Sequence, residues 1–129
     1  MGLAERRLVT AAQEQEFKPF EAKVKEICGF DVKLTFDWAA LENNSQCQWI
    51  CENKKVSSYI FERVTDALKA VCADDMGKTA ARERLKEIQM FPAAGDPEFA
   101  NGILTVRNDV TGNGAYDAAQ IQAVIEKGL

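Results

Sequence analysis

The twelve residues 109–120, DVTGNGAYDAAQ, place oxygen-bearing groups at the spacing of a calcium-binding loop. An EF-hand loop takes oxygen ligands from positions 1, 3, 5, 7, 9 and 12, uses a backbone carbonyl at position 7, and has glycine at position 6. Gly114 occupies position 6 here. The candidate metal ligands are Asp109, Thr111, Asn113, the carbonyl of Ala115, Asp117 and Gln120. The spacing therefore makes calcium a candidate cofactor.

Other features of the same residues favour an ordinary turn into a helix. Gln120 stands where a calcium loop has a bidentate glutamate, and Thr111 replaces an acidic or amide ligand. The preceding segment has the pattern of a strand, whereas an EF-hand needs a helix there. In this second interpretation the glycines beside Asn113 form the turn, Asn113 caps the last helix and Asp117 favours its first turn. We expect the turn and no resident cofactor, with calcium as the alternative.

A second candidate is a basic stripe. Lys78, Arg82 and Lys86 recur at every fourth residue and would share one face of a helix, with Glu83 and Glu87 beside them. Such a pattern usually forms a solvent-exposed helix face with several ion pairs. The alternative function of the stripe is to bind a small anion or an acidic partner.

The chain has no histidine, which excludes a histidine base and histidine zinc ligands. Cys28 and Cys72 end apolar helical stripes and are expected in the core. Cys47 and Cys51 would be about 13 Å apart on a strand, too far for a disulfide. If that segment is helical, the two thiols are adjacent and a metal or redox role gains support. We expect all four cysteines to be reduced.

The periodicity of apolar residues predicts the elements that position these groups. We expect helices over 3–17, 19–28, 58–73, 78–88 and 115–127, the first two forming either one kinked helix or two short ones. Ser57 or Ser58 is expected to cap the third of these helices. Strands are expected over 30–36, 46–52, 88–91 and 101–109.

The expected order of elements is α-β-β-α-α-β-β-α within a single α+β domain, residues 1–129. A small antiparallel sheet of three or four strands, with helices packed on one face, buries these patterns economically. Separations of hairpin length argue against a doubly wound parallel sheet.

Composition restricts the class of function. The chain has 129 residues, is 47% apolar and carries a net charge of −4. That composition suits a folded domain with its own core. The bulk charge gives no sign of the basic surface that nucleic acid needs, so we expect no nucleic-acid partner. The first residues have neither a signal-peptide pattern nor a membrane span, so we expect a cytoplasmic protein without membrane partners.

We expect a small binding or protein-interaction domain without catalytic activity, whose partner is a protein or a small ligand. The alternatives are a small enzyme or ligand carrier that uses carboxylate or cysteine chemistry, and a metal-binding domain built on residues 109–120. A homodimer is compatible with the apolar stripes and edge strands. Aromatic residues gather near the middle of the chain, and any that are exposed would mark an interaction surface. They are Phe36, Trp38, Trp49, Tyr59 and Phe61.

Overall fold

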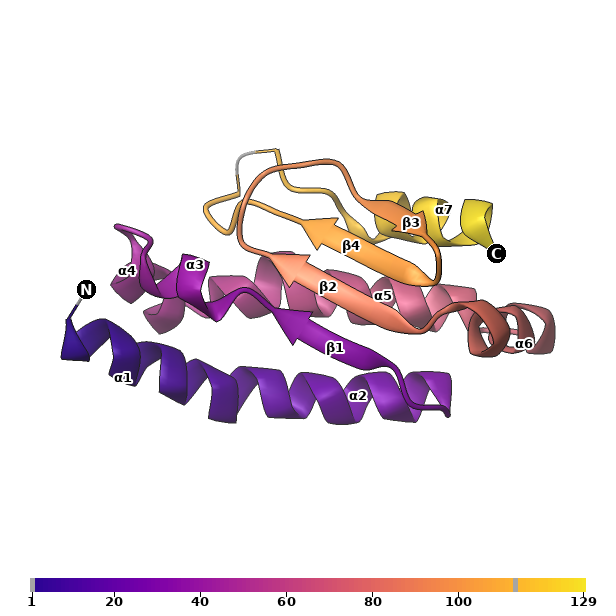
Figure 1. Cartoon of the computed structure of the whole chain (residues 1–129), viewed down its shortest axis with the longest axis horizontal. Helices are drawn as coiled ribbons and strands as arrows, with labels where there is room; N and C mark the ends of the chain where they lie inside the picture. Colours follow the sequence, from indigo (N-terminus) through magenta and orange to yellow (C-terminus); the bar gives the residue numbers. More distant parts are fainter. Residues whose placement is uncertain (1, 113) are drawn as a thin grey trace.

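Four strands form one mixed sheet in the computed structural model, which describes residues 2–112 and 114–129 (Figure 1). The strands are β1 (Lys33–Phe36), β2 (Glu87–Phe91), β3 (Glu98–Ala100) and β4 (Ile103–Arg107). Their order in the sheet is β1-β2-β4-β3. The β1–β2 and β2–β4 pairs are parallel and the β3–β4 pair is antiparallel. The α+β class is therefore confirmed, whereas the expected antiparallel arrangement of the whole sheet is wrong.

The direction of each strand pair follows from the chain between its strands. Residues 37–86 join β1 to β2, and a connection of that length can cross the sheet and re-enter at the same end. Only Asn101 and Gly102 join β3 to β4, and their φ values of 55° and 80° suit a tight hairpin turn. The antiparallel prediction failed because it assumed hairpin-length links throughout.

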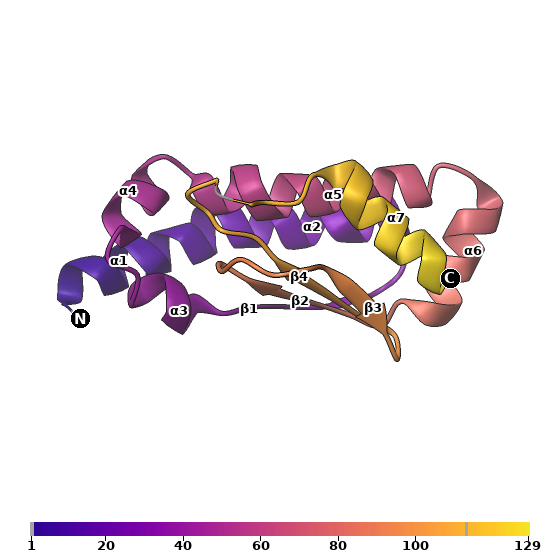
Figure 2. The same ribbon diagram turned by 90° about the horizontal axis from the view of Figure 1, so that it is seen from above.

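The helices lie largely on one side of the sheet, and α2, α5 and α7 share that side in Figure 2. The helical segments, with η marking a π-helical turn, are α1 (Leu3–Ala12), η1 (Gln13–Phe17), α2 (Lys18–Cys28), α3 (Trp38–Glu42), α4 (Cys47–Glu52), η2 (Ser57–Phe61), α5 (Glu62–Val71), α6 (Asp75–Arg84) and α7 (Ala118–Gly128). Among the described residues, no helix combines the length and the apolar character needed to cross a membrane.

Residues 46–52, expected as the second strand, form α4 instead. Cys47 and Ile50 are its buried residues, and Cys51 is half-buried. Cys47 is three residues from Ile50 and four from Cys51, and residues at these spacings share one face of a helix. The segment therefore buries its apolar residues as a helix, although its sequence resembles a strand. The expected order α-β-β-α-α-β-β-α is thus wrong at this point, and the fourth strand of the sheet is β3.

The N-terminal segments α1, η1 and α2 follow one another without a break (Figure 1). Pro19 lies in the first turn of α2, where proline is tolerated, and Gly29 ends this helix in the left-handed conformation with φ 76°. Both features match the sequence prediction.

Several predicted helix ends are wrong. Ser57 does not cap its helix, because Lys55 and Val56 are already helical and Ser57 begins η2. The helix expected over 78–88 ends earlier, since Leu85 is extended with ψ 111° and the chain enters β2. Likewise α7 begins three residues later than expected.

The core lies between the sheet and α5 and α7. Alternate residues of β2 and β4 point into it, and each is at most 1% exposed: Ile88, Met90, Leu104 and Val106. These residues pack in one cluster with apolar residues of α5 and α7. Gly77 of α6 is required by a close approach, because a Cβ there would lie 1.9 Å from the carbonyl oxygen of Val71.

Candidate functional site

An open groove of about 710 Å³ lies between two helical segments of the described residues. One wall comes from residues 15–23, and the other from residues 54–69. We call this cavity the π-turn groove, because η1 and η2 each contribute to one wall. Figure 2 shows that the two helical segments that form it, α2 and α5, run side by side.

Each wall contains a turn in which the helical hydrogen bond spans five residues. The Lys18 N–H donates to the carbonyl of Gln13, and the Glu62 N–H donates to the carbonyl of Ser57. π-Helical turns are rare and are frequent at functional sites. Two of them facing one groove mark this region as the candidate site.

Glu16 and Ser57 connect the two π turns. The Ser57 Oγ–H donates to Glu16 Oε1 at 2.6 Å, across 41 residues of sequence. Glu16 is only 9% exposed. Its second oxygen, Oε2, has no hydrogen-bond partner among the described residues. Every polar side-chain atom that is fully buried in these residues has a partner, so Oε2 is not one of the fully buried atoms. Oε2 therefore reaches solvent, and Glu16 lines the groove.

The floor of the groove is aromatic. Phe20 and Phe61 lie with ring centroids 4.5 Å apart and an angle of 13° between their planes. They are 4% and 3% exposed, so only a small part of each ring reaches the cavity. Thr65 also lies in the wall, but its hydroxyl donates to the carbonyl of Glu62 at 3.0 Å. The floor thus offers apolar contact, and Glu16 offers a hydrogen-bond acceptor.

Exposed charges surround the opening. Lys23, Lys54 and Lys69 line it together with Glu62 and Asp66. None of these five side chains takes part in an ion pair with a described residue. The rim is therefore mixed in sign and open to solvent.

The loop 109–120 uses several of its oxygens locally. Asp109 Oδ1 accepts hydrogen bonds from the Thr111 N–H at 2.8 Å and from its hydroxyl at 2.5 Å. Asp117 accepts from the Gln120 N–H, while the Gln120 side chain accepts from the Asp117 N–H. This capping box starts α7 at Ala118.

The helix cap predicted at Asn113 is wrong, because Asp117 is the N-cap. Asn113 itself lies outside the described residues. Gly112 and Gly114 have φ values of 97° and 72°, as a turn built on glycine requires. Within residues 2–112 and 114–129, no three His, Cys, Asp or Glu side chains are grouped closely enough to hold a metal ion. Calcium binding through Asp109, Thr111, Ala115, Asp117 and Gln120 stays a prediction.

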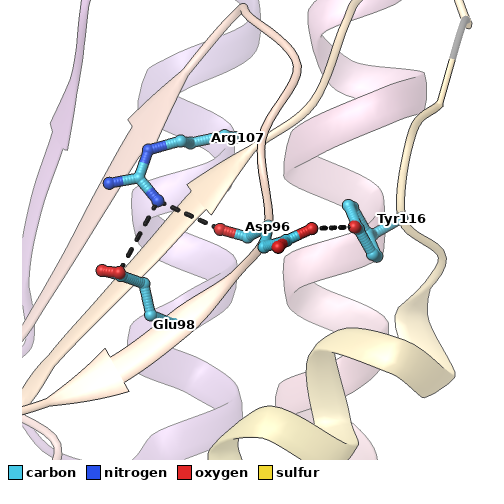
Figure 3. Close-up of polar contacts among 4 residues, drawn as sticks. All are labelled: Asp96, Glu98, Arg107 and Tyr116. Atoms are coloured by element: carbon cyan, nitrogen blue, oxygen red, sulfur yellow. Dashed lines mark hydrogen bonds and ion pairs between the residues drawn. The ribbon is translucent and has the colours of Figure 1, made fainter.

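A polar network anchors this loop to the sheet (Figure 3). Arg107 donates to the carbonyl of Asp96 at 3.0 Å and forms an ion pair with Glu98 at 3.9 Å. The Tyr116 hydroxyl donates to the Asp96 carboxylate, and this hydrogen bond raises the pKa of Tyr116. Asn108, which is fully buried, binds the backbone of Tyr116 through both its amide nitrogen and its oxygen. The network holds the loop in place.

The basic stripe does not form as one helix face. Lys78 and Arg82 lie in α6, but Lys86 comes after its end. The Lys86 ammonium donates to the carbonyl of Arg82 at 3.3 Å. None of the three cations pairs with a described carboxylate. The anion or acidic-partner surface predicted there stays untested.

The four cysteines are free thiols and form two close pairs. Cys47 and Cys51 lie one turn apart on α4, adjacent as the helical alternative predicts. Cys28, the last residue of α2, lies near Cys72, which follows α5. Burial, aided by the partner thiol, raises the pKa of Cys28 and of Cys51 to about 12. Such thiols are poor nucleophiles at neutral pH.

Among the aromatic residues in the middle of the chain, Trp49 stands out with 45% exposure. The Lys55 ammonium lies 5.3 Å from its ring centroid. Phe36 and Phe61 are buried, while Trp38 and Tyr59 are half-buried. One exposed ring gives a small contact surface, well short of a large apolar patch.

Sequence reasoning missed Glu16 and Ser57. Glu16 interrupts a buried stripe at helical spacing: Val9, Ala12, Glu16, Phe20, Val24 and Cys28. A carboxylate at a core position of a helix is a signal that could have revealed the site, because acidic residues are rarely buried without a partner. Ser57 carries no comparable signal.

Comparison with known proteins gives no functional information on this groove. No protein-family model matches the chain, and no curated protein or solved structure matches it either.

Proposed function

We propose that the protein is a binding domain, without turnover of its own, that takes its ligand in the π-turn groove. The observation that carries the proposal is Glu16, a nine-tenths buried carboxylate that lines the groove and has one oxygen without a hydrogen-bond partner among the described residues. Burying a carboxylate is unfavourable unless its charge is compensated. Water reaches Oε2 in the open groove, and a ligand that donates to this oxygen takes the place of that water.

The shape of the groove supports the same proposal. Its volume of about 710 Å³ falls within the range of small-molecule sites. Such sites combine an apolar lining with a few placed polar groups. Here Phe20 and Phe61 supply the apolar lining, and Glu16 and Ser57 supply the polar groups.

An enzyme is the second candidate, and one contact favours it. The Ser57 hydroxyl lies 2.6 Å from Glu16 Oε1, within the range in which a carboxylate accepts a proton from a serine nucleophile. The chain has no histidine to take the usual part of the base. We therefore rank this candidate below the binding domain.

A titration with 2-phenylethanol as a neutral aromatic probe tests the binding proposal. We expect saturable shifts of backbone amide signals from residues 15–23 and 54–69 in two-dimensional NMR spectra. Asp66→Trp, which places a large ring at the exposed rim, should abolish the shifts. Glu83→Trp makes the matched change at an exposed position of α6 outside the groove and should preserve them.

The absence of any groove signal in the wild-type titration would remove the proposal. The enzyme candidate has its own test, the hydrolysis of p-nitrophenyl acetate. We expect equal rates for the wild type and Ser57→Ala, whereas a rate that depends on Ser57 would favour the enzyme. Native mass spectrometry of the same samples reports whether the chain forms a homodimer.

A cytoplasmic location is part of this proposal. Free thiols at all four cysteines support it, since oxidising compartments favour disulfides.

A further inference from the structure

The charge of Glu16 bears on the class of ligand that the groove takes. Within the described residues, the ion pairs are Arg6–Glu42, Lys18–Glu14, Lys25–Asp31 and Arg107–Glu98, and Glu16 is in none of them. Its only described side-chain partner is the neutral hydroxyl of Ser57. The carboxylate thus lacks a cation from the protein while one of its oxygens is open to the cavity.

The charges on the rim act more weakly than Glu16 on a bound group. Lys23, Lys54 and Lys69 are exposed, as are Glu62 and Asp66, so water and salt screen all five. Glu16 is buried, and a buried charge acts through a medium of lower dielectric constant. A group placed against the floor therefore experiences chiefly the field of Glu16.

The floor indicates what the rest of the ligand is. Pro19, Phe20 and Phe61 line the cavity next to Glu16. Phenyl and proline rings favour an apolar or aromatic body over a strongly hydrated one.

We infer that the π-turn groove binds a small organic cation. A primary ammonium or guanidinium group of the ligand donates hydrogen bonds to Glu16 Oε2, and its apolar body lies against Pro19, Phe20 and Phe61. This inference rests on the proposed function and adds the charge of the ligand. It assigns to Glu16 the role of selecting a cation, and to Ser57 the role of orienting the carboxylate.

Three probes with similar bodies and different charges test the inference. 2-Phenylethylamine is a cation at pH 7, 2-phenylethanol is neutral and 3-phenylpropanoate is an anion. We expect the amine to bind about tenfold more tightly than the alcohol, as a charge-assisted hydrogen bond to a buried carboxylate implies. The anion should bind no better than the alcohol. Dissociation constants come from the same NMR titrations of the full chain.

Two variants separate charge from structure. Glu16→Gln keeps an oxygen that accepts from Ser57 and removes the charge, so the amine should lose its advantage over the alcohol. Glu26→Gln removes one charge from an exposed position of α2 outside the groove and should keep that advantage. The three-probe comparison in the wild type stands even if Glu16→Gln does not fold.

The outcomes distinguish this inference from the proposed function. Binding of all three probes with equal affinity keeps the groove as a binding site and overturns the choice of a cation. Tighter binding of 3-phenylpropanoate than of the amine overturns it too and assigns selection to the rim lysines. An advantage of the amine that survives in Glu16→Gln excludes Glu16 as its cause. Lack of binding by every probe removes the proposed function itself.

Discussion

The π-turn groove and the loop 109–120 both contain carboxylates, but these carboxylates form different bonds. In the loop, Asp109 and Asp117 each accept a hydrogen bond from a backbone N–H two or three residues away. In the groove, Glu16 accepts from a side chain 41 residues away and keeps one oxygen open to the cavity. The loop has oxygens at the spacing of a calcium-binding loop, whereas the groove has a carboxylate oxygen without a hydrogen-bond partner among the described residues.

This difference shows what spacing along a chain can and cannot say about a site. Asp and Asn readily bond their own neighbouring backbone, so oxygens at calcium-loop spacing also suit a turn and a helix cap. A site needs groups with bonding capacity left over. That capacity depends on which segments meet in the fold.

The largest effect should come from the floor of the groove. Phe61 is 3% exposed, stacks on Phe20 and lies with its ring centroid 5.7 Å from those of Phe17 and Phe36. Replacing it in Phe61→Ala should lower the free energy of unfolding by about 3–5 kcal/mol through lost burial and the cavity left behind. Urea denaturation measures the change, and Phe61→Leu, which restores much of the volume, should lose less. A loss below about 1 kcal/mol would show that the groove is not built on the core.

The anchor of the loop should rank second. Asn108 is fully buried, donates to the carbonyl of Tyr59 at 2.6 Å and to that of Tyr116 at 3.0 Å, and accepts from the Tyr116 N–H at 2.9 Å. Asn108→Ala leaves these groups without their partner, which should cost about 2–3 kcal/mol. Hydrogen exchange at the Tyr116 amide should also accelerate. Asn108→Asp keeps the acceptor but loses both donated bonds, and should be nearly as unstable. Unchanged exchange at Tyr116 would contradict this role of Asn108.

These two residues also mark how far the sequence could predict the structure. The apolar stripe that ends at Cys28 and the alternation over residues 30–36 gave α2 and β1, because each pattern depends on neighbours along one element. The loop 109–120 was expected as a turn, and its glycines do have positive φ. Helical spacing at Cys47, Ile50 and Cys51 was available but competed with an apparent strand.

The parallel strand pairs and the groove were beyond such reasoning. The direction of β2 relative to β1 depends on how residues 37–86 cross the sheet, which no local pattern states. The π turns at Glu16 and Ser57 meet only because α2 and α5 pack against each other. One local signal of the groove was present in the sequence, because Glu16 is an acidic residue within an otherwise apolar helical stripe.

A smaller effect is expected at the helix cap of the loop. Asp117→Ala removes the capping box of α7 and should cost about 1 kcal/mol of stability. Asp117→Asn, which keeps a capping oxygen, should retain most of the stability. We expect neither calcium nor a chelator to move the melting temperature of the wild type in differential scanning calorimetry. A calcium-dependent rise that disappears in Asp117→Ala would instead make the loop a metal site.

The last effect concerns pH and distinguishes the two regions again, because residues 109–120 contain no cysteine. Burial, then the neighbouring Cys47 and the charge of Glu16, raises the pKa of Cys51 from its ordinary 9.0 to about 12. Between these values the unfolded chain releases a proton that the folded chain keeps, so stability is lost as pH rises above about 9. Cys51→Ala should therefore lose less stability than the wild type between pH 8 and pH 10, measured by urea denaturation. Lysines and tyrosines also titrate at high pH, but both proteins contain them, so their contributions to the pH dependence of stability cancel in the comparison. Equal slopes would show that the environment of Cys51 does not hold its proton.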